Sequence, residues 1–336
     1  MTSSADHPLQ TVLLPDGASL AVEIHGEGPP LLLLHGFPLD HSMWVGQLPL
    51  ARSYQLIMPD QRGFGANSCP AGSQGPASIE QLADDAAALL EGLGVQGPVA
   101  VCGLSMGGYV AQHLAVRHPR LVGSLILVDT KLEADTPEAR AGRGELAAKV
   151  SRLGQEVVAR AMIPNLLAAA SEDAAHQPPL QAQRRDQCVL ELTRMIHACP
   201  VATITAALAA LGARPDMSQA MRGVACPVLL VVGALDTITP PACLERAAGI
   251  FPHARLRIVP DCGHMTPLEA PEIFNAEVED FLRGVAVDRA AAGVLEGDRL
   301  AGAPAVAGRV VAGQPGHPAG QAGHSDPGAN PAAGER

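Results

Sequence analysis

Short apolar runs alternate with segments of helical spacing along most of the chain. The runs lie at 31–34, 54–58, 99–102, 124–128, 228–232 and 256–259. Between several of them, apolar residues recur with the period of a helix, at 79–93, 106–118, 242–251 and 272–282. A continuous apolar run of this length is typical of a strand buried on both faces. The alternation therefore predicts an α/β fold, with a mostly parallel sheet and helices on both of its faces.

The first apolar segments differ from the others because apolar and polar residues alternate in them. They cover 9–14 and 19–24 and flank Pro15-Asp16-Gly17, a tripeptide typical of turns. Alternation on both sides of a turn predicts an antiparallel hairpin. We expect this hairpin at an edge of the sheet.

Two segments depart from the alternation of strands and helices. Residues 131–217 are rich in Ala, Leu, Glu, Gln and Arg, have helical spacing and contain no clear strand. Such an insertion would lie as a helical cap over the carboxyl edge of the sheet, where α/β folds bind their ligands. We therefore predict a core formed by 8–130 and 218–283. Residues 284–336 are dominated by Ala, Gly and Pro, which predicts a disordered tail, with a transient helix at 290–300 as the alternative.

Charge and composition narrow the choice of partners. The 336 residues carry a formal net charge of −11, with 23 Lys and Arg against 34 Asp and Glu. A negative field of this kind opposes binding to nucleic acid or to an anionic membrane surface. With 1 Trp, 2 Tyr and 5 Phe, the chain has few rings on which bases or sugars could stack. We expect a small molecule as the partner and a pocket that is mainly aliphatic.

The sequence gives no sign of a targeting segment or a metal site. Residues 1–10 lack the basic and apolar parts of a signal peptide, and no apolar stretch approaches the roughly 20 residues of a membrane span. The 7 cysteines are scattered without the spacing of a zinc site. We expect reduced thiols, a cytoplasmic protein, and no metal or organic cofactor.

The motif GLSMGG at 103–108 lies between an apolar run and a helical segment. A serine between two glycines at a strand-to-helix turn has its hydroxyl displayed to solvent and to a general base. A side chain at Gly103 or Gly107 would collide with the neighbouring strand or helix. Ser105 is therefore the candidate nucleophile, and a structural glycine-rich turn is the alternative.

A serine hydroxyl needs a base to accept its proton and an acid to orient that base. His264 follows the last predicted strand, and Asp236 follows the strand before it. Both would reach the edge of the sheet that carries Ser105, in the chain order Ser, Asp, His. Asp129 also ends a strand and is the alternative acid. Asp60 is expected to brace a loop by pairing with a cation or a backbone amide.

Attack on a carbonyl also requires donors for the oxyanion that forms. The backbone N–H of Met106 follows the nucleophile at a helix N-terminus and would supply one donor. The backbone N–H of Phe37, in HGFP at 35–38, would supply the other. Both donors are fixed by the backbone and carry no proton that the reaction would remove.

Together these motifs resemble those of the α/β-hydrolase superfamily over about 9–283. HGFP at 35–38, PDQRGFG at 59–65, GLSMGG at 103–108, GALD at 233–236 and GHMTPLEAP at 263–271 occur in the order found in that superfamily. The serine turn and the histidine loop look most like those of small bacterial carboxylesterases and β-ketoadipate enol-lactone hydrolases. The resemblance implies an eight-stranded, mostly parallel sheet with an antiparallel edge hairpin and a helical cap. It also implies the nucleophile, acid, base and oxyanion roles for Ser105, Asp236, His264, Phe37 and Met106.

For function, the resemblance implies hydrolysis of a small carboxylic ester or lactone through an acyl-enzyme intermediate, without a cofactor. An enol-lactone hydrolase of aromatic catabolism is an alternative, and its dianionic substrate would require cap arginines. Five are available: Arg140, Arg143, Arg184, Arg185 and Arg194. Cofactor-free perhydrolases or haloperoxidases and carbon–carbon bond hydrolases share the serine triad, whereas haloalkane dehalogenases use an aspartate nucleophile. Outside the enzymes, a small-lactone receptor on the same fold and a scaffold that has lost its chemistry are the alternatives.

Overall fold

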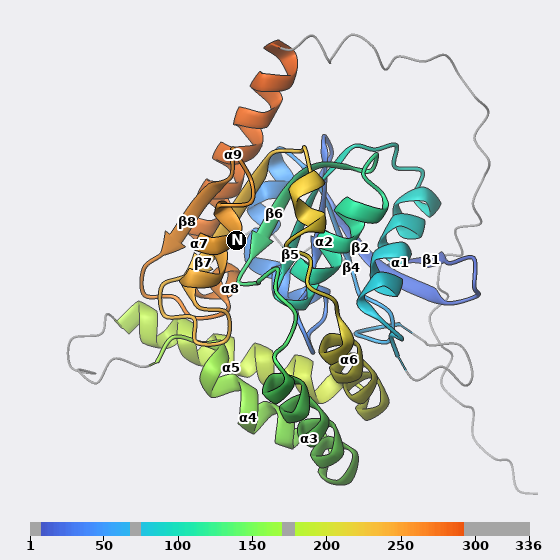
Figure 1. Ribbon diagram of the computed structural model, residues 1–336, viewed down its shortest axis with the longest axis vertical. Helices are drawn as coiled ribbons and strands as arrows, with labels where there is room; N and C mark the ends of the chain where they lie inside the picture. Colours follow the sequence, from blue (N-terminus) through green and yellow to red (C-terminus); the bar gives the residue numbers. More distant parts are fainter. Residues whose placement is uncertain (1–7, 68–74, 170–178, 292–336) are drawn as a thin grey trace, which may run out of the picture.

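A sheet of eight strands forms the centre of the computed structural model, which describes residues 8–67, 75–169 and 179–291 (Figure 1). The strands are β1 (Gln10–Leu13), β2 (Ser19–His25), β3 (Pro30–Leu34), β4 (Gln55–Pro59), β5 (Val99–Leu104), β6 (Val122–Val128), β7 (Val228–Gly233) and β8 (Arg255–Val259). They lie in the order β1-β2-β4-β3-β5-β6-β7-β8. The expectation of an eight-stranded α/β fold is confirmed.

The strands from β3 to β8 pair in parallel, and the N-terminal hairpin supplies the antiparallel edge. β1 pairs antiparallel with β2, and β2 pairs antiparallel with β4. Each of the other neighbouring pairs is parallel. In the turn between β1 and β2, the side chain of Asp16 accepts a hydrogen bond from the N–H of Ala18 at 3.1 Å. Because parallel strands end at the same edge, the loops after β3, β5, β6, β7 and β8 meet there.

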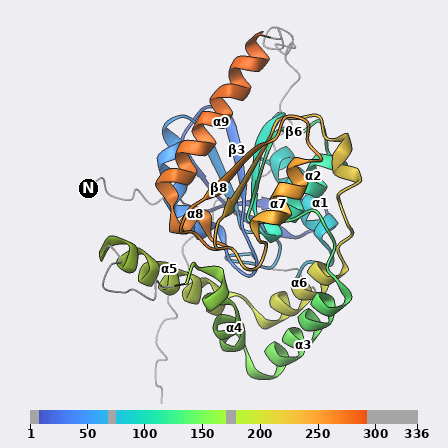
Figure 2. The same cartoon turned by 60° about the vertical axis from the view of Figure 1, so that its left-hand side comes forward.

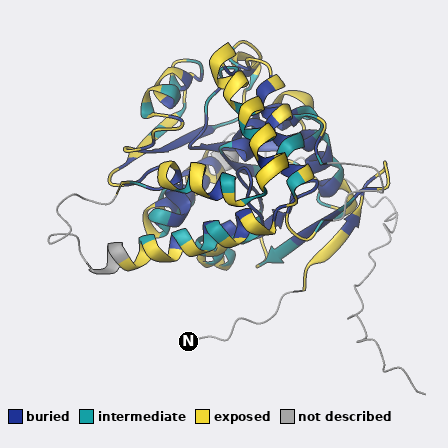
Figure 3. Ribbon diagram, turned by 90° about the horizontal axis from the view of Figure 1, so that it is seen from below, coloured by how far each residue is buried: buried dark blue, intermediate teal, exposed yellow. Residues whose placement is uncertain are grey.

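Helices cover both faces of the sheet (Figure 2). Those outside the 131–217 segment are the 3-10 helices η1 (His41–Arg52) and η2 (Ala220–Gly223) and the α-helices α1 (Ile79–Gly92), α2 (Met106–Arg117), α7 (Pro241–Ala248), α8 (Thr266–Glu269) and α9 (Pro271–Ala291). η1 and α9 share one face, where the rings of Trp44 and Phe274 lie 6.4 Å apart. The opposite face carries α1, α2 and α7. The strands between them are largely buried, and exposed residues line the outer sides of the helices (Figure 3).

Four helices of the 131–217 segment form a separate layer beyond one end of the sheet (Figures 1 and 2). They are α3 (Pro137–Leu153), α4 (Glu156–Leu166), α5 (Pro179–Ala198) and α6 (Val201–Ala213), and are called the cap helices below. The described part of this segment contains no strand. No single helix among the described residues is long and apolar enough to cross a membrane, and residues 183–198 and 201–213 meet that test only as a pair bent by 99°.

A buried ion pair joins the two ends of the cap segment. Arg214, after α6, lies with its Nη1 2.8 Å from Oδ1 of Asp135, which precedes α3. Arg143 of α3 donates to the other oxygen of Asp135 at 2.5 Å. Burial opposes ionisation of Asp135, but Arg143 and Arg214 lower its pKa to about 2. The guanidinium of Arg214 also lies 4.1 Å from the ring centroid of Tyr109 in α2, so the pair connects the cap helices to the core.

The expected start of the tail at 284 does not agree with the structure. Helix α9 continues to Ala291, and Val285 is buried against the hydrophobic core. A docked helix lengthens without a new nucleation cost, so one further apolar contact is enough to extend it. Composition alone missed this contact because 284–291 is rich in small residues. Residues 292–336, the rest of the predicted tail, lie outside the described residues.

Two valines of α9 provide a matched test of this boundary. Val285 is 8% exposed and Val287 is 67% exposed. Val285→Asp should lower the free energy of unfolding by at least about 2 kcal/mol, because an unpaired carboxylate would replace a buried apolar side chain. Val287→Asp should change it by less than about 0.5 kcal/mol. Urea unfolding measures both, and equal effects would show that α9 is not docked at Val285.

Candidate active site

Ser105 lies on a sharp turn between β5 and α2. Its φ of 52° and ψ of −110° place it in a region that a side chain rarely adopts. Its N–H donates to the carbonyl of Val128 at 2.9 Å, and the hydroxyl of Thr130 donates to its carbonyl at 3.0 Å. These bonds fix the backbone while the side chain stays partly exposed among buried neighbours. The strand-to-helix turn that the motif predicts is therefore present, with Ser105 at its centre.

Close backbone contacts require the two glycines that flank this turn. A Cβ atom at Gly103 would lie 2.1 Å from the carbonyl oxygen of Gly107. At Gly107, a Cβ atom would lie 2.1 Å from the carbonyl oxygen of Leu34. Real Cβ atoms do not approach backbone atoms so closely, so α2 can begin directly against the end of β3 only with glycine at these positions.

The loop after β3 lies beside the serine. A Cβ atom at Gly36 would be 3.7 Å from the Cβ of Ser105. The next residue, Phe37, is buried, as is Met106 at the start of α2. Among the described residues, no acceptor is paired with the backbone N–H of Phe37 or of Met106. Two fixed donors without protein partners near a displayed hydroxyl are what an oxyanion site requires.

His264 and Asp236 form a buried hydrogen-bonded pair. Nδ1 of His264 lies 2.8 Å from Oδ2 of Asp236, and the two residues are 2% and 3% exposed. Asp236 is held in turn by the N–H of Ile238 at 2.8 Å and by the N–H and hydroxyl of Thr239 at 3.0 and 2.7 Å. A carboxylate on Nδ1 keeps the proton on that nitrogen, so Nε2 is available as the basic atom. The sequence did not identify Thr239, which follows Asp236 on the same loop.

Charge interactions shift the pKa values of this pair in opposite directions. Burial disfavours the imidazolium of His264, but the hydrogen bond and charge of Asp236, with Asp129 and Glu269, raise its pKa above the usual value. Burial also disfavours the carboxylate of Asp236, but His264 and the Thr239 donors lower its pKa. At neutral pH the site therefore holds an ionised acid beside a strengthened base.

Asp129 lies between the serine turn and the histidine loop, but it does not bind His264. Its carboxylate accepts the N–H of Gly233 at 2.9 Å and the N–H of Thr266 at 3.1 Å. It is fully buried, and burial raises its pKa to about 7. Since Asp236 occupies Nδ1 of His264, the geometry favours Asp236 over Asp129 as the acid.

Ser105 and His264 belong to loops tied to the same short segment. Thr130 binds the carbonyl of Ser105, and the adjacent Asp129 binds the N–H of Thr266, two residues after His264. Among the described residues, neither the Ser105 hydroxyl nor Nε2 of His264 has a hydrogen-bond partner. The structure therefore joins the predicted acid and base directly, and brings the predicted nucleophile to the same edge without a serine–histidine hydrogen bond.

Asp60 braces a loop, as the sequence predicts. Its Oδ1 accepts the N–H of His41 at 2.9 Å and faces Nδ1 of the same residue at 2.7 Å, and its Oδ2 accepts the N–H of Ala66 at 2.8 Å. One potential ligand atom from each of Asp40, His41 and Asp60 lies within 4.8 Å of the other two. Among the described residues, these three form the candidate group for binding a metal ion. Hydrogen bonds within the protein already use both Asp60 oxygens, so loop bracing accounts for the cluster.

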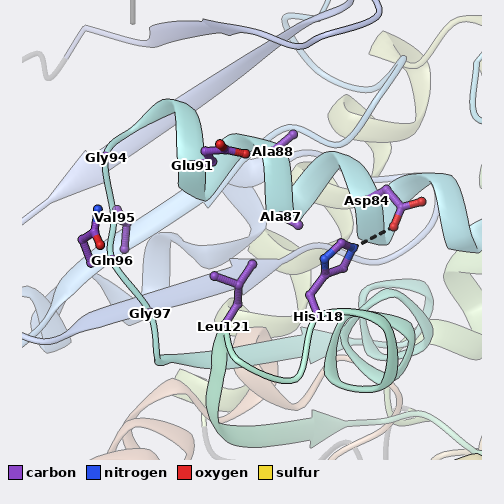
Figure 4. Close-up of a pocket in the computed structure, with 10 residues that line it drawn as sticks. All are labelled: Asp84, Ala87, Ala88, Glu91, Gly94, Val95, Gln96, Gly97, His118 and Leu121. Atoms are coloured by element: carbon purple, nitrogen blue, oxygen red, sulfur yellow. Dashed lines mark hydrogen bonds and ion pairs between the residues drawn. The ribbon is translucent and has the colours of Figure 1, made fainter. Parts of the chain in front are cut away.

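A cleft of about 370 Å³ is lined by other residues than those described above (Figure 4). It is formed by α1, by the segment 94–97 before β5 and by His118 and Leu121 before β6. Within it, Nε2 of His118 lies 2.8 Å from a carboxylate oxygen of Asp84. The cleft is therefore at the amino ends of β5 and β6, whereas Ser105 follows the carboxyl end of β5. It takes no part in the candidate active site.

The close approach at Gly107 can be tested with a second glycine. Gly107→Ala should lower the free energy of unfolding by about 3 kcal/mol or more, because its methyl group would meet the backbone of Leu34. Gly142→Ala, in α3, is the control because its Cβ would meet nothing within 4 Å. There alanine should stabilise the helix by about 0.5–1 kcal/mol. Thermal unfolding followed by circular dichroism compares them, and similar melting temperatures would contradict the close approach.

Comparison with known proteins identifies the family. A thermophilic esterase from Thermogutta terrifontis has 34% identity to this chain, covers 83% of it and 99% of its own length, and gives a TM-score of 0.75. The enol-lactonase from Burkholderia xenovorans has 26% identity, covers 81% and 99%, and gives a TM-score of 0.71. A pimeloyl-acyl-carrier-protein methyl ester esterase from Aeromonas hydrophila is 29% identical over 79% of this chain and 99% of its own. The family model of the alpha/beta hydrolase fold matches residues 29–271, and the chain belongs to this family.

Proposed function

We propose that the chain hydrolyses a small carboxylic ester or lactone through an acyl-enzyme intermediate on Ser105. The observation that carries this proposal is the buried 2.8 Å hydrogen bond between Asp236 and His264, on loops at the sheet edge where Ser105 is displayed. A neutral histidine that is hydrogen-bonded to a carboxylate in this way, and whose pKa is raised, is suited to remove a proton from an alcohol. The similarity to esterases supports the same reaction class.

Each residue of the site has a part in the proposed reaction. As Ser105 Oγ attacks the carbonyl carbon, Nε2 of His264 accepts the hydroxyl proton. Asp236 keeps the other ring nitrogen protonated and stabilises the imidazolium. The N–H groups of Phe37 and Met106 stabilise the oxyanion, and His264 then returns the proton to the leaving alcohol. Water, activated by His264, releases the acid from Ser105. Catalytic hydrogen bonds often shorten only when substrate binds, which fits a Ser105 hydroxyl that has no partner in the described part of the chain.

The cap arginines favour an uncharged ester over a dianionic enol lactone. Arg184 lies 2.7 Å from Glu272, Arg194 lies 3.7 Å from Asp40, and Arg143 is bound by Asp135. Arg185 donates to the carbonyl of Ala168. Guanidinium groups that already have protein partners are poorly placed to bind two substrate carboxylates. Of the five arginine side chains, Arg140 alone has neither an ion pair nor a hydrogen bond among the described residues.

Replacement of the nucleophile tests the proposal directly. Ser105→Ala should lower kcat for p-nitrophenyl acetate by at least about a thousandfold and abolish labelling by a fluorophosphonate probe. Ser151→Ala is the matched control, since Ser151 is exposed on α3 and its hydroxyl binds the carbonyl of Ala147. Steady turnover by the Ser105→Ala protein, or probe attached to another residue, would overturn the proposal. A panel of esters and lactones of increasing acyl size, with Ser105→Ala as the blank, then defines the substrate.

The raised pKa of His264 predicts the acid side of the pH profile. Only the neutral imidazole accepts a proton, so kcat/KM should rise with pH through a midpoint above about 6.5, the usual histidine value. The charged groups that raise this pKa are Asp236, Asp129 and Glu269. Asp129→Asn removes a carboxyl group that is partly ionised near pH 7 and should move the midpoint to lower pH. A midpoint at or below about 6.5 in the wild type would contradict the assignment of His264 as the base.

A further inference from the structure

The carboxylate of Glu269 binds both sides of the histidine loop. Its Oε1 accepts the N–H of Gly263 at 2.9 Å and the N–H of Met265 at 3.3 Å. These two residues flank His264, so a single oxygen fixes the backbone from which the imidazole extends. Burial raises the pKa of Glu269, while these donors and the charge of Arg185 oppose that rise.

The second oxygen of the same carboxylate binds the cap segment. Oε2 of Glu269 accepts the N–H of Ala168, just after α4, at 2.7 Å. Beside this bond, the N–H of His264 itself donates to the carbonyl of Leu166 at 2.9 Å. A Cβ atom at Gly263 would lie 2.5 Å from the nitrogen of Ala168, so the two backbones are in direct contact. The carboxylate of Glu269 and one backbone hydrogen bond therefore join the histidine loop to the end of α4.

We propose that Glu269 is a positioning residue that couples the docking of the cap helices to the placement of His264. This inference rests on the proposed function, because placement of the ring matters only if His264 is the base. When α4 leaves the core, the bond from the His264 N–H to Leu166 breaks and Glu269 loses its third donor. The loop then has fewer constraints, and a displacement of about 1 Å is enough to slow proton transfer up to a hundredfold. The base is held in its working position when the cap is docked.

The variant Glu269→Gln tests whether one carboxylate must bind both the histidine loop and the cap segment. An amide has one acceptor oxygen, so its NH2 group must face N–H donors on one side, either those of the loop or that of Ala168. Glu272→Gln is the matched control. Glu272 also reaches the cap, through Arg184, but its side chain is 70% exposed and binds no described atom of the histidine loop. Arg185→Gln is a second variant, because it removes the guanidinium that donates to the Ala168 carbonyl but leaves every hydrogen bond of Glu269 in place.

Hydrogen exchange of the whole protein, followed by mass spectrometry, measures the coupling without reference to activity. In Glu269→Gln, peptides covering 160–169 and 261–270 should both exchange roughly tenfold faster, with no change over β6. Arg185→Gln should also speed exchange in 261–270, because coupling between two sites is reciprocal. Faster exchange in only one of the two segments, in either variant, would overturn the proposal.

Kinetics supply the second measurement. Glu269→Gln should lower kcat for p-nitrophenyl acetate about tenfold or more with KM within about threefold, whereas Glu272→Gln should leave both unchanged. If Ser105→Ala loses turnover while Glu269→Gln retains the wild-type kcat, the proposed function stands and the coupling inference falls. If Ser105→Ala keeps turnover, the proposed function falls, and with it the positioning role of Glu269, whatever the exchange data show.

Discussion

The buried carboxylate of Asp129 is the constraint on which the arrangement of the site depends. Asp129 directly follows β6 and has a φ of 43°, and its side chain accepts N–H groups from the end of β7 and from the histidine loop. Next to it, Thr130 binds the carbonyl of Ser105. One short segment in the middle of the sheet thus fixes three loops that lie far apart in the sequence. Separate catalytic loops on parallel strands can hold a common geometry only through such cross-connections.

Local sequence patterns were sufficient to predict the strands of the sheet and the turn at its edge. The apolar runs at 31–34 and 99–102 are strands because both of their faces are covered, and β1 alternates because one of its faces is solvated. The sharp turn at Ser105 could be predicted because it imposes glycine on both sides. Each of these features is determined by a few neighbouring residues and the covalent geometry of the backbone, which a single sequence contains.

Features that depend on distant contacts could not be read in the same way. The hydrogen bond between Ala168 and Glu269 spans 101 positions, and the one between Thr266 and Asp129 spans 137. Nothing near Glu269 in the chain distinguishes it from an ordinary helix-start carboxylate. The continuation of α9 past 284 likewise depends on burial of Val285 by residues from other elements. Composition predicted the general character of these segments, but it did not predict the individual long-range contacts that determine where they pack and where they end.

The ion pair between Arg214 and Asp135 has a mechanical consequence. It joins the two points at which the chain leaves and re-enters the core, and the guanidinium packs on the Tyr109 ring. This end of the cap helices is therefore held against the core. Separating a buried pair of this kind costs several kcal/mol. Hydrogen bonds and not a buried ion pair join the other end, where α4 meets the histidine loop, so we expect any separation of the two layers to begin there.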